Sequence, residues 1–364
     1  MNAYFKSIIK ELAETSRRRE KMSPDMLTRE AYENYPKKFY KFRSMQGDSR
    51  KYTIDMLNEA YLWAANPSTF DDNSDSRLAI PEGYEKQILQ WFSSHLAEMW
   101  FYELPPKGMK GKKAGHTLDD YIKVQESFKD EHGKVKKQEL LSAMRKMVHG
   151  LSQQELQQLR KVVNSKLLSD DNNPFIKGWE ERREEIVNAF HDKSLVACVT
   201  RTYKNRKMWE DYADKYRGIV VEYVLPEYEK LTDEQKLVLL HLFPVSYYKQ
   251  IPKVSLIPLF EWVFRKNYWG EETDISDYLA ELYEQVLYKE MDYSAEKELR
   301  FVDCGVEHKI AVPFIRKVYV GYKISPKNLN RIKRICKEKG YKLCVQKEDR
   351  NKREFDYVEL SVSD

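Results

Sequence analysis

Apolar residues in the middle of the chain change from strand-like to helical spacing and back again. Residues 195–199 form a short apolar, β-prone run, and the β-branched run at 219–221 indicates a second strand. Between them, the spacing over 208–216 predicts a helix with one apolar face, and Gly218 is expected to cap its C-terminus. The apolar positions of this helix are Met208, Trp209, Tyr212, Ala213 and Tyr216.

Two aromatic residues of this helix, Trp209 and Tyr212, should be buried between the helix and the flanking strands. Their spacing places both side chains on one helical face. Large aromatic side chains contribute strongly to a protein core. We therefore predict a structural role for both residues.

Similar patterns continue on both sides of this stretch. Further strands are predicted at 38–45, 60–65, 244–248, 293–302, 317–322, 342–346 and 355–362. Further helices are predicted at 1–34 (as one or two helices), after Thr53, and at 179–190, 233–242, 275–286 and 325–339. The strands are short and do not alternate regularly with helices, which argues against a doubly wound sheet. The sequence predicts an α+β fold with a mixed, largely antiparallel sheet wrapped by helices.

The long charged region at 81–191 differs from the sequence around it. Within it, apolar residues return at helical spacing over 140–168, and no strand pattern interrupts them. We predict a helical insertion at 81–191. The remaining chain then divides into an N-terminal helical segment at 1–36 and an α+β core formed by 37–80 and 192–364.

Composition indicates a folded chain without a membrane span. The 364 residues include 25 Tyr, 15 Phe and 7 Trp, and a net charge of +5 arises from 63 basic and 58 acidic residues. No apolar run of about 18 residues occurs, and the N-terminus does not have the pattern of a signal peptide. We expect a bacterial cytoplasmic protein. The four cysteines have no paired spacing, so they are expected to be free thiols.

Standard signatures for nucleotide, zinc and hydrolase sites are missing from the sequence. The seven histidines are scattered, so no bound metal is expected. The acidic loop with Asp71, Asp72 and Asp75 could hold magnesium through oxygen ligands, but such loops are usually solvated turns. A magnesium-dependent nuclease is the weakest of the functions considered.

Glu296, Glu298 and Arg300 alternate at the start of a predicted strand. Alternation aims all three side chains at one side, where two like charges favour a cation or a substrate beside them. Arg300 could itself be that cation, so structural pairing and a ligand site both remain open.

Basic residues gather locally at 107–113 and at 327–339. A solvated surface explains such patches, and no recognised nucleic-acid module accompanies them. A non-catalytic module that recruits nucleic acid or a protein through the basic part of the insertion is the alternative to an enzyme.

Several ordered blocks resemble the uncharacterised bacterial family known as domain of unknown function 2971. The blocks are Tyr40-Lys41-Phe42-Arg43, Leu62-Trp63, Pro67-Ser68, Phe70-Asp71-Asp72, Cys198-Val199-Thr200, Met208-Trp209 with Tyr212-Ala213 and Gly218, Pro244-Val245 with Tyr247, Glu296 to Arg300, and Val318 to Gly321. The sequence departs from the family pattern at Asp71, where the family favours Asn, and at Tyr216 and Tyr293, where His and Trp are frequent. The insertion at 81–191 lies outside the blocks.

The order Arg43, Thr200, Glu298 is also similar to that of ADP-ribosyltransferases. This resemblance implies an NAD-consuming transferase or hydrolase, with NAD as substrate and a role as a toxin or phage-defence effector. Glu298 and Thr200 would be catalytic, and the dinucleotide would be held by Arg43, Arg300 and Tyr61. A fixed carboxylate suits the ribosyl oxocarbenium ion of this reaction, while an arginine suits pyrophosphate. If Glu298 is catalytic, its carboxylate should open into a cleft that also receives Arg43 and lies near Thr200.

Overall fold

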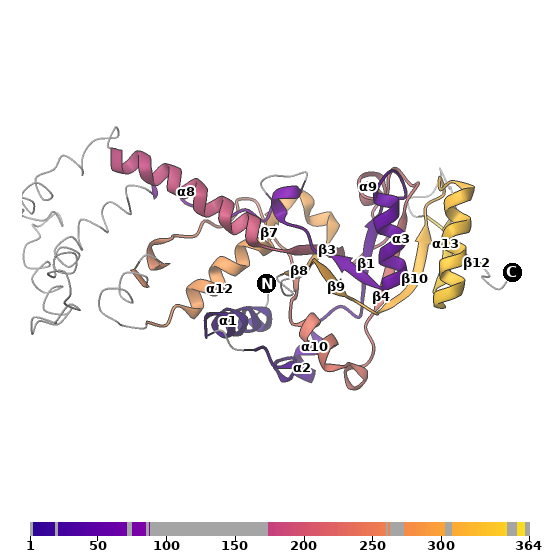
Figure 1. The fold of residues 1–364 in the computed structure, drawn as a ribbon, viewed down its shortest axis with the longest axis horizontal. Helices are drawn as coiled ribbons and strands as arrows, with labels where there is room; N and C mark the ends of the chain where they lie inside the picture. The colour runs from indigo at the N-terminus through magenta and orange to yellow at the C-terminus, as the bar shows by residue number, and fades with distance from the viewer. Residues whose placement is uncertain are drawn as a thin grey trace, which may run out of the picture. The chain divides into compact units, whose positions relative to one another are not determined.

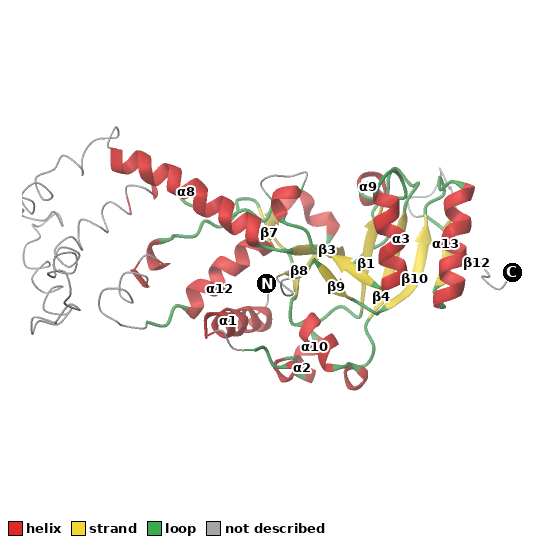
Figure 2. Cartoon of the chain, viewed as in Figure 1, coloured by secondary structure: helices red, strands yellow, loops and turns green. Residues whose placement is uncertain are grey.

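The computed structural model describes residues 3–18, 21–70, 75–84, 87, 174–259, 261–262, 273–302, 308–347 and 355–360. The chain divides into two compact units (Figures 1 and 2). Unit 1 contains 1–79, 187–253 and 276–364, and unit 2 contains 80–186 and 254–275. Unit 2 therefore takes in most of the predicted insertion together with a later segment. Most of 81–191 lies outside the described residues, and its described C-terminal part is the helix α8 (Pro174–Lys193).

An eight-stranded sheet forms the framework of unit 1. Its strands, in spatial order, are β12 (Tyr357–Leu360), β11 (Lys342–Gln346), β10 (Ile315–Val320), β4 (Ile219–Val224), β1 (Lys38–Arg43), β3 (Val196–Thr200), β8 (Glu298–Val302) and β5 (Leu242–Pro244). Only the β10–β11 pair is parallel, and the other pairs are antiparallel. Two further small sheets join β2 (Tyr61–Trp63) to β9 (Lys309–Ala311) and β6 (Ser246–Tyr248) to β7 (Tyr288–Glu290). The predicted α+β class with a mixed, largely antiparallel sheet is confirmed.

Helices surround this framework. They are α1 (Ala3–Arg18), α2 (Arg29–Glu33), α3 (Ser49–Glu59), α9 (Arg206–Asp211), α10 (Asp233–Leu239), α12 (Ser276–Glu284) and α13 (Pro326–Lys339), with short 3₁₀ turns at Pro24–Met26, Pro67–Thr69, Tyr228–Lys230, Gln285–Leu287 and Met291–Glu296. Among these, α1 packs against α12 and α13 against α3. In the described part of the chain, no helix is long and apolar enough to span a membrane.

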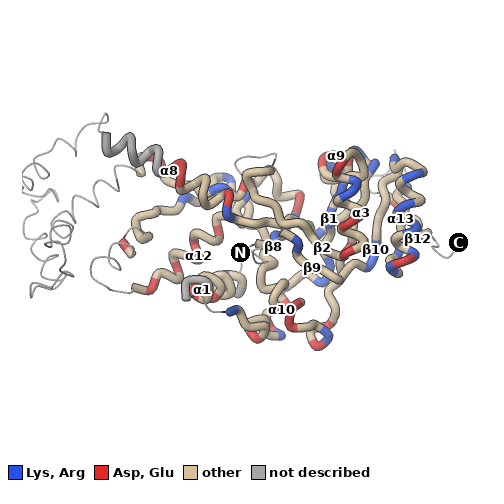
Figure 3. Tube along the Cα trace, viewed as in Figure 1, with Lys and Arg blue, Asp and Glu red and all other residues tan. Residues whose placement is uncertain are grey.

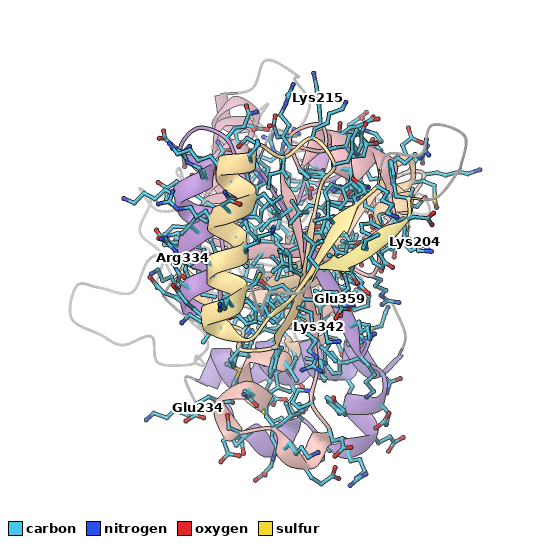
Figure 4. The ribbon with its side chains drawn as sticks, turned by 90° about the vertical axis from the view of Figure 1, so that its right-hand side faces the viewer. Lys204, Lys215, Glu234, Arg334, Lys342 and Glu359 are labelled. Carbon is cyan, nitrogen blue, oxygen red and sulfur yellow. The ribbon has the colours of Figure 1, made fainter. Side chains whose placement is uncertain are left out.

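The parallel crossover from β10 through α13 to β11 follows its local sequence closely. Ser325 caps α13 by accepting a hydrogen bond from the Asn328 amide, and Gly340 ends the helix in the left-handed region at φ 72°. Lysine and arginine lie along α13, which contains the whole basic segment 327–339 (Figure 3). At the sheet edge, Lys342 of β11 and Glu359 of β12 lie side by side (Figure 4), with Lys342 Nζ 3.1 Å from Glu359 Oε1.

Alternation along the strands creates a core on each face of the sheet. On β4, Ile219, Val221 and Tyr223 belong to the larger core, whereas Val220 points to the other face. The smaller core contains Tyr40, Phe42, Met208, Trp209, Ala213, Tyr216, Val220, Tyr319 and Cys344. The face with the smaller core is therefore the one over which α9 is folded.

The helix in the central stretch is shorter than predicted. It ends at Asp211, and Asp214, Lys215 and Tyr216 then adopt left-handed backbone conformations. The predicted C-cap role of Gly218 is therefore wrong. A Cβ atom at Gly218 would lie only 2.2 Å from the Arg43 carbonyl oxygen, so glycine is needed there for close backbone approach.

Trp209 and Tyr212 differ in burial, although both were predicted to be buried. Trp209 is fully buried, its Nε1 donates to the Tyr203 carbonyl at 2.8 Å, and its ring meets Phe42 edge to face. Tyr212 is 44% exposed, so the prediction that it is buried is wrong. Its hydroxyl group instead donates to Glu296 Oε1 at 3.1 Å, outside the core that contains Trp209.

Candidate functional site

A pocket of about 550 Å³ opens in unit 1 beside β1, β3 and β8. Its volume lies in the range of small-molecule sites, about 300–1,000 Å³. Aromatic, apolar and charged side chains line it together. The lining residues are Tyr40, Lys41, Phe42, Thr69, Phe70, Asp75, Cys198, Val199, Thr200, Lys207, Met208, Asp211, Tyr212, Lys289, Tyr293, Glu296 and Glu298.

The sheet register explains why strand residues meet at this pocket. Tyr40 of β1 pairs with Thr200 of β3, and Thr200 pairs with Glu298 of β8. Directly paired residues present their side chains on the same face of a sheet. The three strands thus deliver Tyr40, Thr200 and Glu298 to one face.

Arg300 organises a buried network of charges behind the pocket. Its side chain is fully buried, and Nε donates to Glu298 Oε1 at 2.7 Å. Nη2 donates to Asp75 Oδ1 at 2.7 Å. Nη1 donates to Ser76 Oγ at 2.7 Å and to the carbonyl of Val286. All three nitrogens of the guanidinium group therefore have acceptors.

Lys289 of β7 is the second cation of this network. Its Nζ lies 2.9 Å from Glu296 Oε2, 2.9 Å from Glu298 Oε2 and 3.4 Å from Asp75 Oδ2. Burial alone would lower the pKa of this ammonium group, but the carboxylates around it raise the pKa instead. Tyr212 completes the network by donating its hydroxyl hydrogen to Glu296 Oε1 at 3.1 Å.

The Glu298 carboxylate is held in its ionised form. Burial alone would raise the pKa of Glu298, but the charges of Arg300 and Lys289 lower it to about 2. Three buried carboxylates, those of Asp75, Glu296 and Glu298, face only two buried cations. When all five groups are ionised, the network keeps one unit of negative charge next to the pocket.

Thr200 has its hydroxyl group committed to the backbone. The hydroxyl donates to the carbonyl of Glu296 and accepts a hydrogen bond from the Thr202 amide at 3.1 Å. Its side chain is almost fully buried. In this arrangement, Thr200 positions the turn that carries Glu296.

The predicted convergence of Arg43, Thr200 and Glu298 on one cleft is wrong. Thr200, Glu298 and Arg300 come together, whereas Arg43 and Tyr61 do not line the pocket. Arg43 lies an odd number of positions after Tyr40 on β1, so alternation turns it to the opposite face. There, burial lowers the pKa of Arg43, and the titratable groups that oppose this shift are the phenols of Tyr223 and Tyr61. This placement does not support dinucleotide binding by Arg43 and Tyr61. Arg300 is fully buried, gives all its nitrogens to protein acceptors and does not line the pocket, so its predicted role in dinucleotide binding is not supported either.

Glu296 lies at the site, but it is not part of the strand that was predicted to carry it. The strand β8 begins at Glu298, and Lys297 adopts a left-handed conformation at φ 47°. Glu296 therefore precedes the strand instead of alternating with Glu298 along it. Lys289 nevertheless bridges the two carboxylates.

Sequence reasoning missed three members of the site. Asp75 stood out only as part of an acidic loop, and its actual partners are Arg300 and Lys289. Lys289 lies in a three-residue strand with no clear pattern. Lys41 belongs to the aromatic block of the family resemblance, where nothing marked it as a site residue.

Only one of the two predicted basic segments lies within the described residues, namely 327–339 on α13. Residues 107–113 lie outside the described residues, so recruitment of nucleic acid or protein through the insertion stays a prediction.

Across the described ranges, no group of three or more His, Cys, Asp or Glu side chains is placed to hold a metal ion. Asp71 and Asp72 also lie outside those ranges.

Comparison with known proteins gives one match. Residues 208–301 match the model of a family described as "Protein of unknown function (DUF2971)". The resemblance to this family is thus supported over a range that includes Tyr212, Lys289, Glu298 and Arg300. No curated protein and no solved structure matches the chain.

Proposed function

We propose that unit 1 is an NAD-consuming enzyme similar to ADP-ribosyltransferases, and that the pocket beside Glu298 binds the cationic nicotinamide ribosyl part of NAD. The observation that carries this proposal is the ionised carboxylate of Glu298, which lines the pocket and is held in place by the buried network. A site with low dielectric and a fixed negative charge favours a positively charged ligand or transition state.

The walls of the pocket suit a flat aromatic ring. Tyr40, Phe42, Tyr212 and Tyr293 all line it, and aromatic faces attract a cationic ring. Lys207 at the pocket is exposed and carries a positive charge suited to phosphate oxygens. These groups would hold the ring at one end and the pyrophosphate at the other.

Glu298 would act through its charge. Cleavage of the glycosidic bond leaves the electron pair on the nicotinamide nitrogen, so nicotinamide departs as a neutral molecule. The ribosyl group then carries the positive charge until water or an acceptor group adds to its anomeric carbon and loses a proton. Glu298 stays ionised throughout because Arg300 and Lys289 keep its pKa low. Thr200 would contribute by holding the turn at Glu296.

The first experiment measures the reaction itself. The full-length protein is incubated with NAD, and free nicotinamide is quantified by chromatography over time. We expect release of nicotinamide by the wild type and strong loss of release in Glu298→Gln, because the amide keeps the shape but removes the charge. Folded Glu298→Gln with full activity would contradict the role of Glu298.

A second experiment isolates the charge requirement. 1-Methylnicotinamide, which is methylated on the ring nitrogen, is a cation, whereas nicotinamide is a neutral molecule of nearly the same shape. We expect calorimetric titration to show tighter binding of the cation to the wild type and a smaller preference in Glu298→Gln. Equal binding of both compounds to the wild type would contradict the electrostatic basis of the proposal.

A toxin or phage-defence role belongs to the same proposal, because loss of NAD would stop the growth of a host cell. Expression of the wild type should then arrest growth and lower cellular NAD. Expression of Glu298→Gln at the same level should do neither.

A further inference from the structure

Three lysines line the same pocket, and one of them differs from the other two. Lys289 has three carboxylate neighbours, and Lys207 pairs with Asp211 at 2.7 Å. Lys41 has no carboxylate partner within the described residues, and its Nζ donates to the backbone carbonyl of Cys198 at 2.7 Å. Its ammonium group is thus partly desolvated without a compensating ion pair.

The arrangement of β1 and β3 explains the position of Lys41. The two strands share a single register pair, Tyr40 with Thr200, and they do not continue to pair beyond it. The side chain of Lys41 reaches across this break to the Cys198 carbonyl, beside the pocket. The nearest carboxylate on β8, that of Glu298, has both oxygens occupied by Arg300 and Lys289.

The pKa of Lys41 is also shifted in the opposite direction from the pKa values of Lys207 and Lys289. Burial lowers the pKa of Lys41 to about 8, and the neighbouring charge of Arg43 acts in the same direction, while Cys198 and Glu298 oppose it. The carboxylates raise the pKa of Lys289 despite its burial, and Asp211 raises that of Lys207. Near pH 8, a substantial fraction of Lys41 is a neutral amine, while Lys207 and Lys289 are ammonium ions.

We propose that Lys41 is a nucleophilic amine that forms an imine with an aromatic aldehyde or ketone bound in the pocket. A neutral lysine in a desolvated pocket is the form that attacks carbonyl carbon. The aromatic lining favours a carbonyl compound that carries a ring. This activity does not require NAD and so goes beyond the function proposed above.

The reaction balances without a further reagent. The lone pair of Nζ adds to the carbonyl carbon, and the carbonyl oxygen takes up the two protons that the amine loses. Water leaves, and a carbon–nitrogen double bond remains between the ligand and Lys41. For a trapping experiment, cyanoborohydride supplies a hydride to this carbon and makes the bond permanent.

The test uses the wild-type full-length protein with pyridoxal and sodium cyanoborohydride, followed by peptide mass spectrometry. Lys207 and Lys289 serve as internal controls, since they line the same pocket and meet the same reagent. At pH 8 we expect Lys41 to be modified at least tenfold faster than Lys207 or Lys289. Equal rates at Lys41 and Lys207, or no modification of Lys41, would overturn the proposal.

The pH profile gives a second, independent readout. The rate at Lys41 should rise with pH and level off above a midpoint near 8, whereas the rate at exposed lysines should still be rising at pH 10. A midpoint for Lys41 near that of the exposed lysines would also overturn the proposal. Lys41→Arg should remove the fast phase of labelling and leave labelling at Lys207 unchanged.

Discussion

Replacement of Arg300 by methionine is the most direct test of the buried charge network. Arg300 is fully buried, and methionine is an unbranched, flexible side chain without charge or donors. The change removes the hydrogen bonds to Glu298, Asp75, Ser76 and the Val286 carbonyl. Lys289 would then remain as the single buried cation beside three carboxylates.

The expected cost follows from this imbalance. Removal of one partner from a buried ion pair destabilises a protein by about 3–5 kcal/mol. Because Arg300 contacts two carboxylates, we expect a value at the upper end of this range. About 3–5 kcal/mol corresponds to a fall in Tm of about 6–20 °C for a folding unit of about 150–250 residues, the size class of unit 1. The loss should become smaller below about pH 5, where protonation of a carboxylate relieves the repulsion.

The assay is urea and thermal unfolding of the wild type and Arg300→Met at several pH values. Arg334→Met is a matched control, because it makes the same substitution at an exposed ion pair. The Arg334 side chain on α13 is 67% exposed, and its Nε lies 3.8 Å from Glu338 Oε1. We expect the control to change the free energy of unfolding by less than about 1 kcal/mol. Arg300→Met within 1 kcal/mol of the wild type at pH 7 would refute the reasoning, as would a loss independent of pH.

Three further substitutions test other parts of the structure. Trp209→Ala should cost about 3–5 kcal/mol by urea unfolding, because it empties a fully buried site, and unchanged stability would contradict this. Gly321→Ala should cost about 1–3 kcal/mol, since its Cβ atom would lie 2.2 Å from the Tyr216 carbonyl oxygen, and a neutral effect would show that the turn can move. Lys41→Met should raise Tm at pH 7, and this gain should shrink as pH rises from about 8 towards 10.5. In that window the unfolded wild type binds more protons than the folded form, so wild-type stability increases with pH; a gain that stays constant would contradict the lowered pKa.

Much of the local structure could be predicted from the sequence, because it depends on neighbouring residues. The pattern around α13 shows this well: Ser325, Pro326 and Gly340 mark its ends, and the structure has the helix between them. The burial of Trp209 was also predicted correctly. Tyr212 was not, because periodicity does not show that its hydroxyl group meets Glu296, a residue that only the tertiary fold brings beside it.

For the candidate site, the sequence alone determined which residues carry suitable chemistry, and the tertiary structure decided which of them meet. Glu298 and Arg300 are close in sequence, and their pairing on β8 was an open alternative from the start. Asp75 lies 225 residues from Arg300 along the chain, and only the fold brings their side chains to 2.7 Å. Arg43 has the right chemistry but lies on the opposite face of β1, because alternation places every second side chain there. Contacts over such separations depend on the order and register of the strands, which no local pattern encodes.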